Sequence, residues 1–294
     1  MVLKGKEMVV NPVDQESRKK PDLSGLYNPQ ELRERQAYYH EVIRNYTMMA
    51  DPFARNMLKD MACAEYVIQV ITGQKDLKVQ EVTVQADYQN LQGKSSILDC
   101  VARDAENNLY DIEVEQTGAG TEPKRARYYS GLLDMNILKK GEDYTRLRKA
   151  YVIFIAQNDE LGRGLPIYHI RRVVEETGDP FSDDSYVIYV NAGLQEDTEL
   201  GRLMHDFHCS DPAEMYSDIL RERARALKNT AMEVESMCNE LKEIEQYGME
   251  KGVLYTRRQS ALQMLADGLP HATIARYTGL TEEEVDQLAE QRPA

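Results

Sequence analysis

Four acidic side chains in the stretch LDCVARDAENNLYDIEVEQ (98–116) are spaced so that they can meet on one surface. They are Asp99, Asp111, Glu113 and Glu115. The residues on each side of DAENN alternate with period two, which predicts a β-hairpin whose loop is 104–108. In that register Asp99 lies directly opposite Glu113. Because successive side chains of a strand point to opposite faces, all four acids are expected on the same face.

Acids crowded in this way are unfavourable, because like charges directly opposed on paired strands repel, with Cβ atoms roughly 5 Å apart. A divalent cation between them would reverse the sign of that interaction. Carboxylate-rich sites suit Mg²⁺ or Mn²⁺, and such an ion can activate a water molecule and stabilise charge on a phosphodiester. The alternative is a solvent-facing hairpin whose acids keep the sheet soluble, and spacing alone leaves both interpretations open.

The densest group of basic residues follows the hairpin closely, in KRARYYSG (124–131). If this segment is helical, Lys124, Arg127 and Tyr128 are neighbours at i, i+3 and i+4. The loop after Glu115 is short, so this group should lie near the acids, and phosphate is the ligand that it would favour. The alternative is a solvated helix face paired with nearby acids.

The elements around these residues predict a mixed α/β sheet domain that ends near residue 200. A buried helix over 52–73, ending at a glycine, precedes a strand in KVQEVTVQADYQN, then the hairpin, then a helix over 122–141. Two buried-type strands follow, AYVIFIA (150–156) and SYVIYVNA (185–192). The glycine-rich segment between them should contain a loop and a short helix.

The remainder of the chain is charged and favours helices, and 211–248 predicts one or two long amphipathic helices. Three short helices should follow, with Thr281 as an N-cap and Glu284 three residues later. The last two resemble a helix-turn-helix, but the acids of TEEEVDQ would repel phosphate, so we expect a helical cap or interaction element. The expected domains are an N-terminal arm and leading helix (1–44), a core (45–205) and a helical C-terminal extension (206–294).

Net charge, apolar runs and cysteine spacing exclude several classes of protein. The 294 residues carry a net charge of −14, so any contact with nucleic acid needs a local basic patch or bound cations. The apolar runs are strand-sized and no secretory signal is recognisable, so we expect a cytoplasmic protein with no membrane contact. The four cysteines form no CxxC pair, which argues against a disulfide scaffold and a structural zinc site. His205 and His208 are expected to be packed or capped.

Two separate blocks of the chain resemble a known family. They are KSSILDCVARDAENNLYDIEVEQTGAGTEPKRARYYSGLLD and LGRGLPIYHIRRVVEETGDPFSDDSYVIYVNA. From about residue 45 onward the chain is similar to the PD-(D/E)xK nuclease family transposases, relatives of the recombination-promoting nucleases of bacteria. The resemblance implies a restriction-endonuclease-like core and metal-dependent cleavage of DNA. It implies Asp99 and Glu113 as the two motif acids, and Glu65 as an additional acid on the preceding helix.

The third position of the motif departs from the family pattern. The wider superfamily carries Lys there, and this branch often carries Gln, whereas this chain has Glu115. A carboxylate adds negative charge where a Lys or Gln would orient the attacking water or offset charge. Either Glu115 helps to hold a metal, or the site has decayed into a binding module.

We therefore expect a Mg²⁺- or Mn²⁺-dependent DNA endonuclease associated with recombination or mobile elements. The residues expected in its site are Asp99, Glu113 and Glu115 for catalysis, Asp99, Glu113 and Glu65 for the metal, and Lys124, Arg127 and Tyr128 for DNA. The long helix after the core would pair two copies into a homodimer. The alternative function is a catalytically degenerate nuclease fold that binds nucleic acid or a partner protein.

Overall fold

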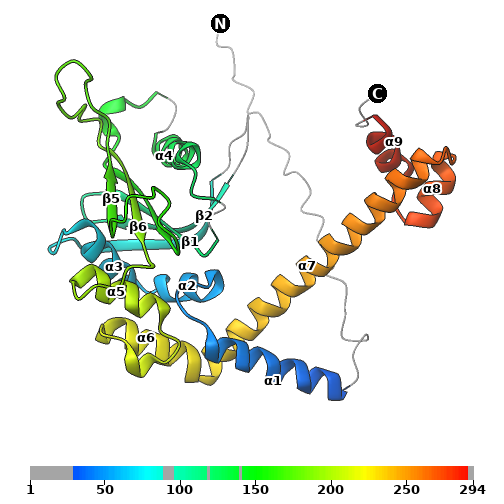
Figure 1. The fold of residues 1–294 in the computed structure, drawn as a ribbon, viewed down its shortest axis with the longest axis horizontal. Coiled ribbons are helices and arrows are strands. Elements are labelled where there is room, and N and C mark those ends of the chain that lie inside the picture. Colours follow the sequence, from blue (N-terminus) through cyan, green and yellow to red (C-terminus); the bar gives the residue numbers. More distant parts are fainter. Residues whose placement is uncertain (1–28, 89–95, 118–119, 139–140, 291–294) are drawn as a thin grey trace, which may run out of the picture.

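The computed structural model describes residues 29–88, 96–117, 120–138 and 141–290. Helices cover both faces of one mixed sheet, and a long helix leads from the sheet to two short helices near the C-terminus (Figure 1). Of the expected N-terminal arm and leading helix, residues 1–28 lie outside the described residues.

The helices are α1 (Pro29–Asn45), α2 (Asp51–Leu58), α3 (Met61–Thr72), α4 (Pro123–Ile137), α5 (Glu199–His208), α6 (Asp218–Asn229), α7 (Ala231–Ala266), α8 (His271–Thr278) and α9 (Glu282–Glu290). The strands are β1 (Val79–Tyr88), β2 (Ser96–Asp104), β3 (Leu109–Glu115), β4 (Ala150–Ala156), β5 (Ile167–Ile170) and β6 (Ser185–Asn191). Their order in the sheet is β1-β2-β3-β4-β6-β5. The pairs β1–β2, β2–β3 and β5–β6 are antiparallel, and β3, β4 and β6 are parallel. This arrangement confirms the predicted restriction-endonuclease-like core with a helical C-terminal region.

The hairpin of β2 and β3 has the predicted register. Its pairs run from Cys100 with Ile112 to Arg103 with Leu109. Asp104 fixes the loop, because its carboxylate accepts hydrogen bonds from the backbone N–H of Glu106 at 2.9 Å and of Asn108 at 2.8 Å. The register, and with it the face on which each acid stands, therefore follows from local sequence.

Different helices bury the two faces of the sheet. One core contains side chains of α2, α3, α5, α6 and the first part of α7, and a second core lies between the sheet and α4. A third, small core joins the end of α7 to α8 and α9. The helical extension thus has two parts, of which the first completes the core of the sheet domain. The expected domain boundary at 205/206 falls inside α5.

Three local features differ from the expectations. The buried helix expected over 52–73 is two helices, because Asp60 caps α3 by accepting the backbone N–H of Ala62 at 2.9 Å. The short helix expected between β4 and β6 is not found within 157–184, where the alternating residues of β5 pair with β6 instead. The first of the three short C-terminal helices is the end of α7, which runs unbroken for 36 residues.

Candidate active site

The hairpin brings the two predicted motif acids together. Asp99 stands one step beyond the pair of Cys100 and Ile112, which places it opposite Glu113. Its backbone N–H donates a hydrogen bond to Glu113 Oε1 at 2.9 Å. The side chain of Glu113 is fully buried, whereas Asp99 is partly exposed. Of the two acids, Glu113 is therefore enclosed by the protein, and Asp99 is accessible to solvent.

The pKa values of these acids show how strongly burial and crowding act on them. Burial raises the pKa of Glu113 to about 8, and the charge of Asp99 contributes to the shift. Burial raises the pKa of Asp99 to about 6, with a further contribution from Asp51 at the start of α2. A backbone hydrogen bond from Val114 opposes the shift at Asp99. The fold thus holds carboxyl groups where their ionised forms are disfavoured.

Asp111, which is not one of the two predicted motif acids, is also completely buried. Its side chain has no exposed surface, and neither carboxylate oxygen has a hydrogen-bond partner. Burial raises the pKa of Asp111 well above its usual range, and the charges of Glu113 and Asp99 raise it further. As two ionised carboxylates Asp111 and Glu113 cannot hydrogen-bond to each other, and Asp111 has no other donor among the described residues. When one of them carries a proton, a side-chain hydrogen bond to Glu113 also raises the pKa of Asp111. A buried polar group without a partner costs about 1–3 kcal/mol, so this position needs an explanation beyond stability.

One cation, Arg125 of α4, reaches into this group of acids. Its Nη2 lies 2.9 Å from Glu113 Oε2, and its Nη1 lies 2.6 Å from Glu115 Oε1. The guanidinium also donates to the Tyr129 hydroxyl and to the backbone carbonyl of Gly120, each at 2.7 Å. Arg125 thus bridges the second motif acid and the acid that stands where the family pattern has Lys or Gln. The motif KRAR contained this residue, but helical spacing alone singled out its neighbours.

Gly120 makes room for the Arg125 bridge. Its backbone has a φ of +126°, a conformation that side chains rarely adopt. A Cβ at this position would stand 2.0 Å from Arg125 Nη1 and 2.6 Å from Glu115 Oε1. The loop between β3 and α4 therefore needs a glycine for two reasons, its backbone conformation and the space taken by the ion pair.

The residues predicted to contact DNA lie on α4 beside Arg125. Lys124 and Arg127 are exposed, and no ion pair joins either of them to the acids of the hairpin among the described residues. Tyr128 is half-buried and packs against the core beneath α4. Two cations of this group are thus accessible to a ligand, and their contact with DNA stays a prediction.

Glu65 has other partners than the hairpin acids. Its Oε1 forms an ion pair with Lys78 Nζ at 2.6 Å, and its Oε2 accepts the backbone N–H of Val79 at 3.0 Å. The helical acid whose charge acts on Asp99 is instead Asp51, which pairs with Arg55 at 3.3 Å. The structure therefore brings Asp99, Glu113 and Glu115 together and places Glu65 in contact with β1.

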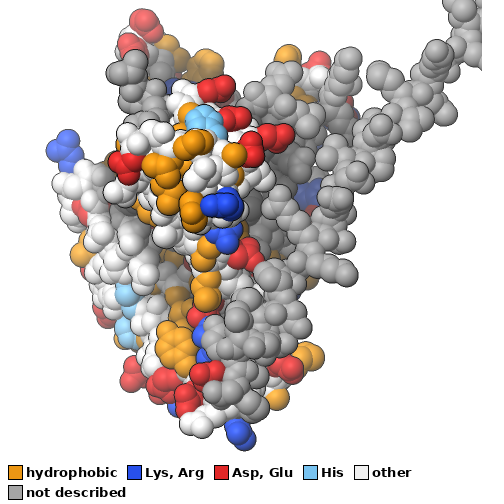
Figure 2. Space-filling model, turned by 90° about the vertical axis from the view of Figure 1, so that its right-hand side faces the viewer, with side chains coloured by type: hydrophobic (Ala, Val, Ile, Leu, Met, Phe, Trp, Pro, Cys, Tyr) orange, Lys and Arg blue, Asp and Glu red, His pale blue; other side chains and the backbone are white. Residues whose placement is uncertain are grey.

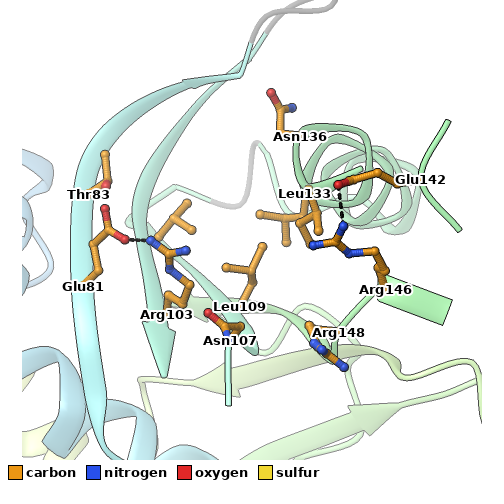
Figure 3. Close-up of a pocket in the computed structure, with 12 residues that line it drawn as sticks. Glu81, Thr83, Arg103, Asn107, Leu109, Leu133, Asn136, Glu142, Arg146 and Arg148 are labelled. Carbon is orange, nitrogen blue, oxygen red and sulfur yellow. Dashed lines mark hydrogen bonds and ion pairs between the residues drawn. The ribbon is translucent and has the colours of Figure 1, made fainter. Parts of the chain in front are cut away.

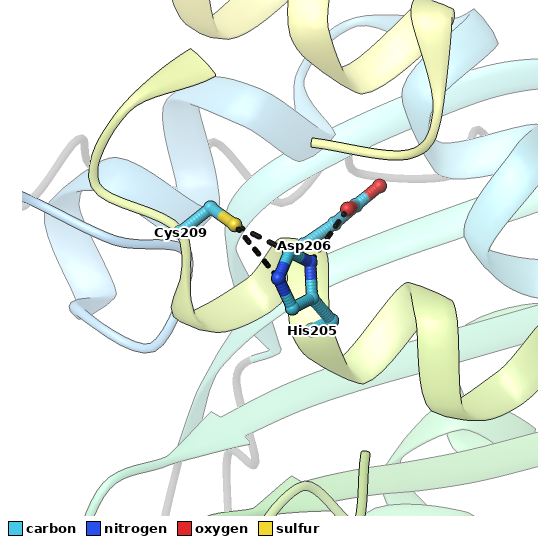
Figure 4. A group of neighbouring side chains, drawn as sticks. All are labelled: His205, Asp206 and Cys209. Carbon is cyan, nitrogen blue, oxygen red and sulfur yellow. Dashed lines mark hydrogen bonds and ion pairs between the residues drawn. The ribbon is translucent and has the colours of Figure 1, made fainter. Parts of the chain in front are cut away.

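A second group of potential metal ligands lies at the end of α5. Within the described part of the chain, ligand atoms of three such residues come within 4.8 Å of one another at His205, Asp206 and Cys209 (Figure 4). Asp206, however, already accepts two backbone N–H groups ahead of α6, at 2.7 and 2.8 Å. Burial raises the pKa of the Cys209 thiol to about 11, which keeps it protonated. Asp206 therefore caps the chain ahead of α6, and the ring of His205 packs edge-on against Tyr216 with 4.8 Å between centroids, as expected of a packed histidine.

The donor set of the hairpin suits a hard divalent cation. Asp99, Asp111, Glu113 and Glu115 offer only carboxylate oxygens, and the single guanidinium of Arg125 balances one of four negative charges when all are ionised. The orphaned oxygens of Asp111 are a further sign that positive charge is lacking. The guanidinium bridges Glu113 and Glu115, and three ligand atoms of these acids do not come within 4.8 Å of one another. The chemistry of the site fits a metal, and Arg125 occupies part of it.

A mixed sheet whose central hairpin carries paired acids, flanked by helices on both faces, defines a protein of the restriction-endonuclease-like class. The family model "PD-(D/E)XK nuclease family transposase" matches residues 66–251, and the chain belongs to this family. This confirms the resemblance seen in the sequence. No curated protein and no solved structure gives a significant match.

The C-terminal helices match a second model, "Rpn/YhgA-like nuclease family, C-terminal HTH domain", over residues 260–290. This match overturns the expectation of a helical cap. Thr281 and Glu284 form the predicted capping box, with N–H to side-chain oxygen distances of 3.1 and 2.9 Å. Acids at the start of a helix stabilise it through the helix dipole, which gives TEEEVDQ a structural reason independent of DNA. Within the described residues, no helix is both long and apolar enough to cross a membrane.

Proposed function

We propose that the protein is a divalent-metal-dependent DNA endonuclease. The observation that carries this proposal is the buried Asp111, whose ionised carboxylate has no hydrogen-bond donor or ion pair among the described residues and which stands beside Glu113 and Asp99. A fold that needed these acids only for solubility would leave them in water, where their pKa values would be ordinary. Recombination or a mobile element is the biological setting that the family membership supports.

Asp99 and Glu113 would hold Mg²⁺ or Mn²⁺, with Glu115 as a further ligand. The ion would supply Lewis-acid stabilisation of charge on the scissile phosphate. Arg125 orients Glu113 and Glu115 through its two Nη atoms, and Tyr129 orients Arg125 in turn. Exposed Lys124 and Arg127 would contact the DNA backbone, with Tyr128 beside them. Glu65 is a more distant member of the proposed ligand set, since Lys78 and β1 already bind its oxygens.

Cleavage of supercoiled plasmid DNA tests this proposal directly. With Mg²⁺ or Mn²⁺ the wild-type protein should nick or linearise the plasmid, and Asp99→Ala should lower the rate at least ~100-fold, because one of the two motif acids is lost. Asp76→Ala is the control, since Asp76 is an exposed acid outside the hairpin. Equal cleavage rates for wild-type and Asp99→Ala protein of the same purity would show that Asp99 takes no part in cleavage.

A second candidate function has its own support. The Arg125 bridge satisfies Glu113 and Glu115 without any metal, as expected of a degenerate nuclease fold that binds nucleic acid or a partner.

Calorimetric titration of Mn²⁺ into Arg125→Gln distinguishes the two functions. A retained metal site should bind Mn²⁺ about tenfold more tightly in this variant, because a competing positive charge is removed. A degenerate site should bind no ion, and Arg125→Gln should then only lower stability, by about 3–5 kcal/mol. Lys124→Gln is the matched control, since Lys124 is exposed on the same helix turn.

DNA and a second copy of the chain are the partners that we propose. The helix-turn-helix match supports DNA. Large apolar side chains exposed along α7 support a homodimer, and they include Ile244, Tyr247, Val253 and Tyr255. All four cysteines are free thiols, which fits the cytoplasm as the proposed compartment.

A further inference from the structure

A cavity of about 510 Å³ lies between the sheet and the end of α4. It is lined by Leu109 at the start of β3 and by Leu133 and Ile137 near the end of α4. Arg125 and the motif acids instead lie near the start of α4. Glu113 is four residue steps from Leu109 along β3, which is about 13 Å, whereas Asp111 pairs with Val101 across the hairpin. None of the four acids of the hairpin lines the cavity, so the cavity is a neighbouring site that does not share the acids of the proposed active site.

The floor of this cavity is apolar and its rim is basic. Leu133 is fully buried, and Val101 and Leu109 are nearly so. Three arginines line the rim, namely Arg103, Arg146 and Arg148. Figure 3 shows Arg146 extending toward the open centre above Leu109, with Arg103 on the opposite side, where its guanidinium meets Glu81.

The charges at the rim do not cancel. Arg103 forms an ion pair with Glu81, and Arg146 pairs with Glu142 at 2.6 Å. Arg148 has no ion pair or hydrogen bond among the described residues. Three guanidinium groups thus face two carboxylates, which leaves a local positive charge in a protein whose net charge is −14.

We propose that this cavity binds a small organic phosphate, with a nucleoside monophosphate as the simplest ligand that fits. Guanidinium groups that approach a common space from two sides repel one another, and an anion between them removes that repulsion. The planar fork of Arg matches the oxygens of a phosphate. Lone Arg148 supplies the charge that no carboxylate of the described residues neutralises.

The rest of the cavity suits the organic part of such a ligand. Val101, Leu109 and Leu133 form a surface on which a base or sugar can pack. Asn107 and Asn136 contribute amide groups that can donate and accept hydrogen bonds. The volume lies within the usual range of small-molecule sites, about 300–1,000 Å³. Inorganic phosphate would use the rim and leave this apolar surface uncovered.

Calorimetric titration of deoxyadenosine monophosphate into the full chain tests the proposal. EDTA in the buffer keeps divalent ions from the acids of the hairpin, so failure here is independent of failure of the proposed nuclease. We expect saturable binding, weakened about tenfold by Arg148→Ala because a charge-assisted hydrogen bond is lost. Lys149→Ala should leave the affinity unchanged, because Lys149 is the adjacent exposed cation and does not line the cavity. Glu142→Gln should strengthen binding several-fold by freeing Arg146.

Three further probes test the parts of the ligand. Deoxyadenosine and inorganic phosphate should each bind at least about tenfold more weakly than the nucleotide, since each lacks one half of the contacts. Absence of saturable nucleotide binding, or equal affinity in Arg148→Ala, would overturn the proposal. Binding of a short single-stranded DNA that depends on Arg148, without binding of the nucleotide, would also overturn it and would assign the cavity to nucleic acid.

Discussion

Single residues explain why the acids of the hairpin matter. Asp111 and Glu113 are both fully buried, and the charges of Glu113 and Asp99 raise the pKa of Asp111. Arg125 is the only cation that contacts the hairpin acids among the described residues, and it contacts Glu113 and Glu115 but not Asp111. Among the described residues the direct ion pairs of this group are therefore those of Glu113 and Glu115, and Asp99 and Asp111 have none, although Arg55 and Arg125 act on them electrostatically.

This imbalance predicts how stability depends on pH. In the unfolded chain the carboxyl group of Asp111 loses its proton near pH 4, at about 3.9. In the folded protein burial raises the pKa of Asp111 well above that value, so folding takes up a proton in the interval between the two. The stability that this proton contributes is fully present below the unfolded pKa and is lost as the pH rises through the folded pKa. Glu113, with a pKa raised to about 8, acts in the same direction.

We therefore expect the free energy of unfolding, measured by urea denaturation in EDTA, to fall between about pH 5 and pH 8. Asp111→Asn should make this fall shallower and raise the free energy of unfolding at pH 8 by roughly 1–3 kcal/mol, because the amide cannot ionise. Asp76→Asn, at an exposed acid, should leave the slope as it is in wild type. An identical slope for Asp111→Asn would show that Asp111 is ionised in the folded protein.

At the scale of elements, the turn from β3 into α4 decides where Arg125 points. Pro123 and the backbone of Glu122 start α4, and Arg125 follows in its first turn. Gly120 precedes this start and leaves the space through which the guanidinium reaches Glu115. The hairpin, the loop and α4 are therefore coupled, and a substitution in the loop should change how Arg125 contacts Glu113 and Glu115.

Two glycines in this unit should respond oppositely to the same substitution. Gly120→Ala places a Cβ within 3 Å of Arg125 and Glu115 at a positive φ, so we expect a loss of about 1–3 kcal/mol in the free energy of unfolding. Gly131→Ala lies inside α4 with no atom within 4 Å of the new Cβ, so we expect a gain of about 0.5–1 kcal/mol. Thermal denaturation of the two variants measures both. A stabilised Gly120→Ala protein would mean that the Arg125 bridge is absent in solution.

At the scale of the whole molecule, the described residues form a sheet domain with two cores and a small helical domain with its own core, connected by α7. Ala261, Ile274, Leu280 and Val285 are buried in the small domain, apart from the cores of the sheet. Figure 2, which views the molecule from the side of α8 and α9, shows a small group of Lys and Arg side chains near the centre beside hydrophobic ones, with acidic side chains around it and other basic side chains scattered at the edges of the view. A small basic group of this kind predicts a weak, salt-sensitive contribution of this domain to DNA binding.

Removal of residues 260–294 should therefore separate two properties. The free energy of unfolding of the sheet domain should change by less than ~1 kcal/mol, because its two cores contain no residue of the removed segment. DNA affinity, measured by fluorescence anisotropy at low salt, should fall several-fold because the helix-turn-helix is lost. Unchanged DNA affinity would assign α8 and α9 a role other than DNA binding.

Features that depend on neighbours along the chain follow from the amino-acid sequence. Alternation of side chains predicts β2 and β3 and their register, because a strand has a period of two. The capping pair of Thr281 and Glu284 likewise depends on residues three apart. These local rules, together with the resemblance to a family, are sufficient to predict the face that Asp99 and Glu113 share.

Packing between elements determines which other groups meet those acids. Arg125 reaches Glu113 because α4 packs back across the sheet at one particular rotation, and helical spacing cannot reveal that rotation. Asp51 is near Asp99, and Glu65 is not beside it, because α2 and α3 break apart at Asp60. Burial of Asp111 without a partner is a property of the closed core between the sheet and α4. Each of these depends on contacts between residues distant in the chain, which local patterns do not encode.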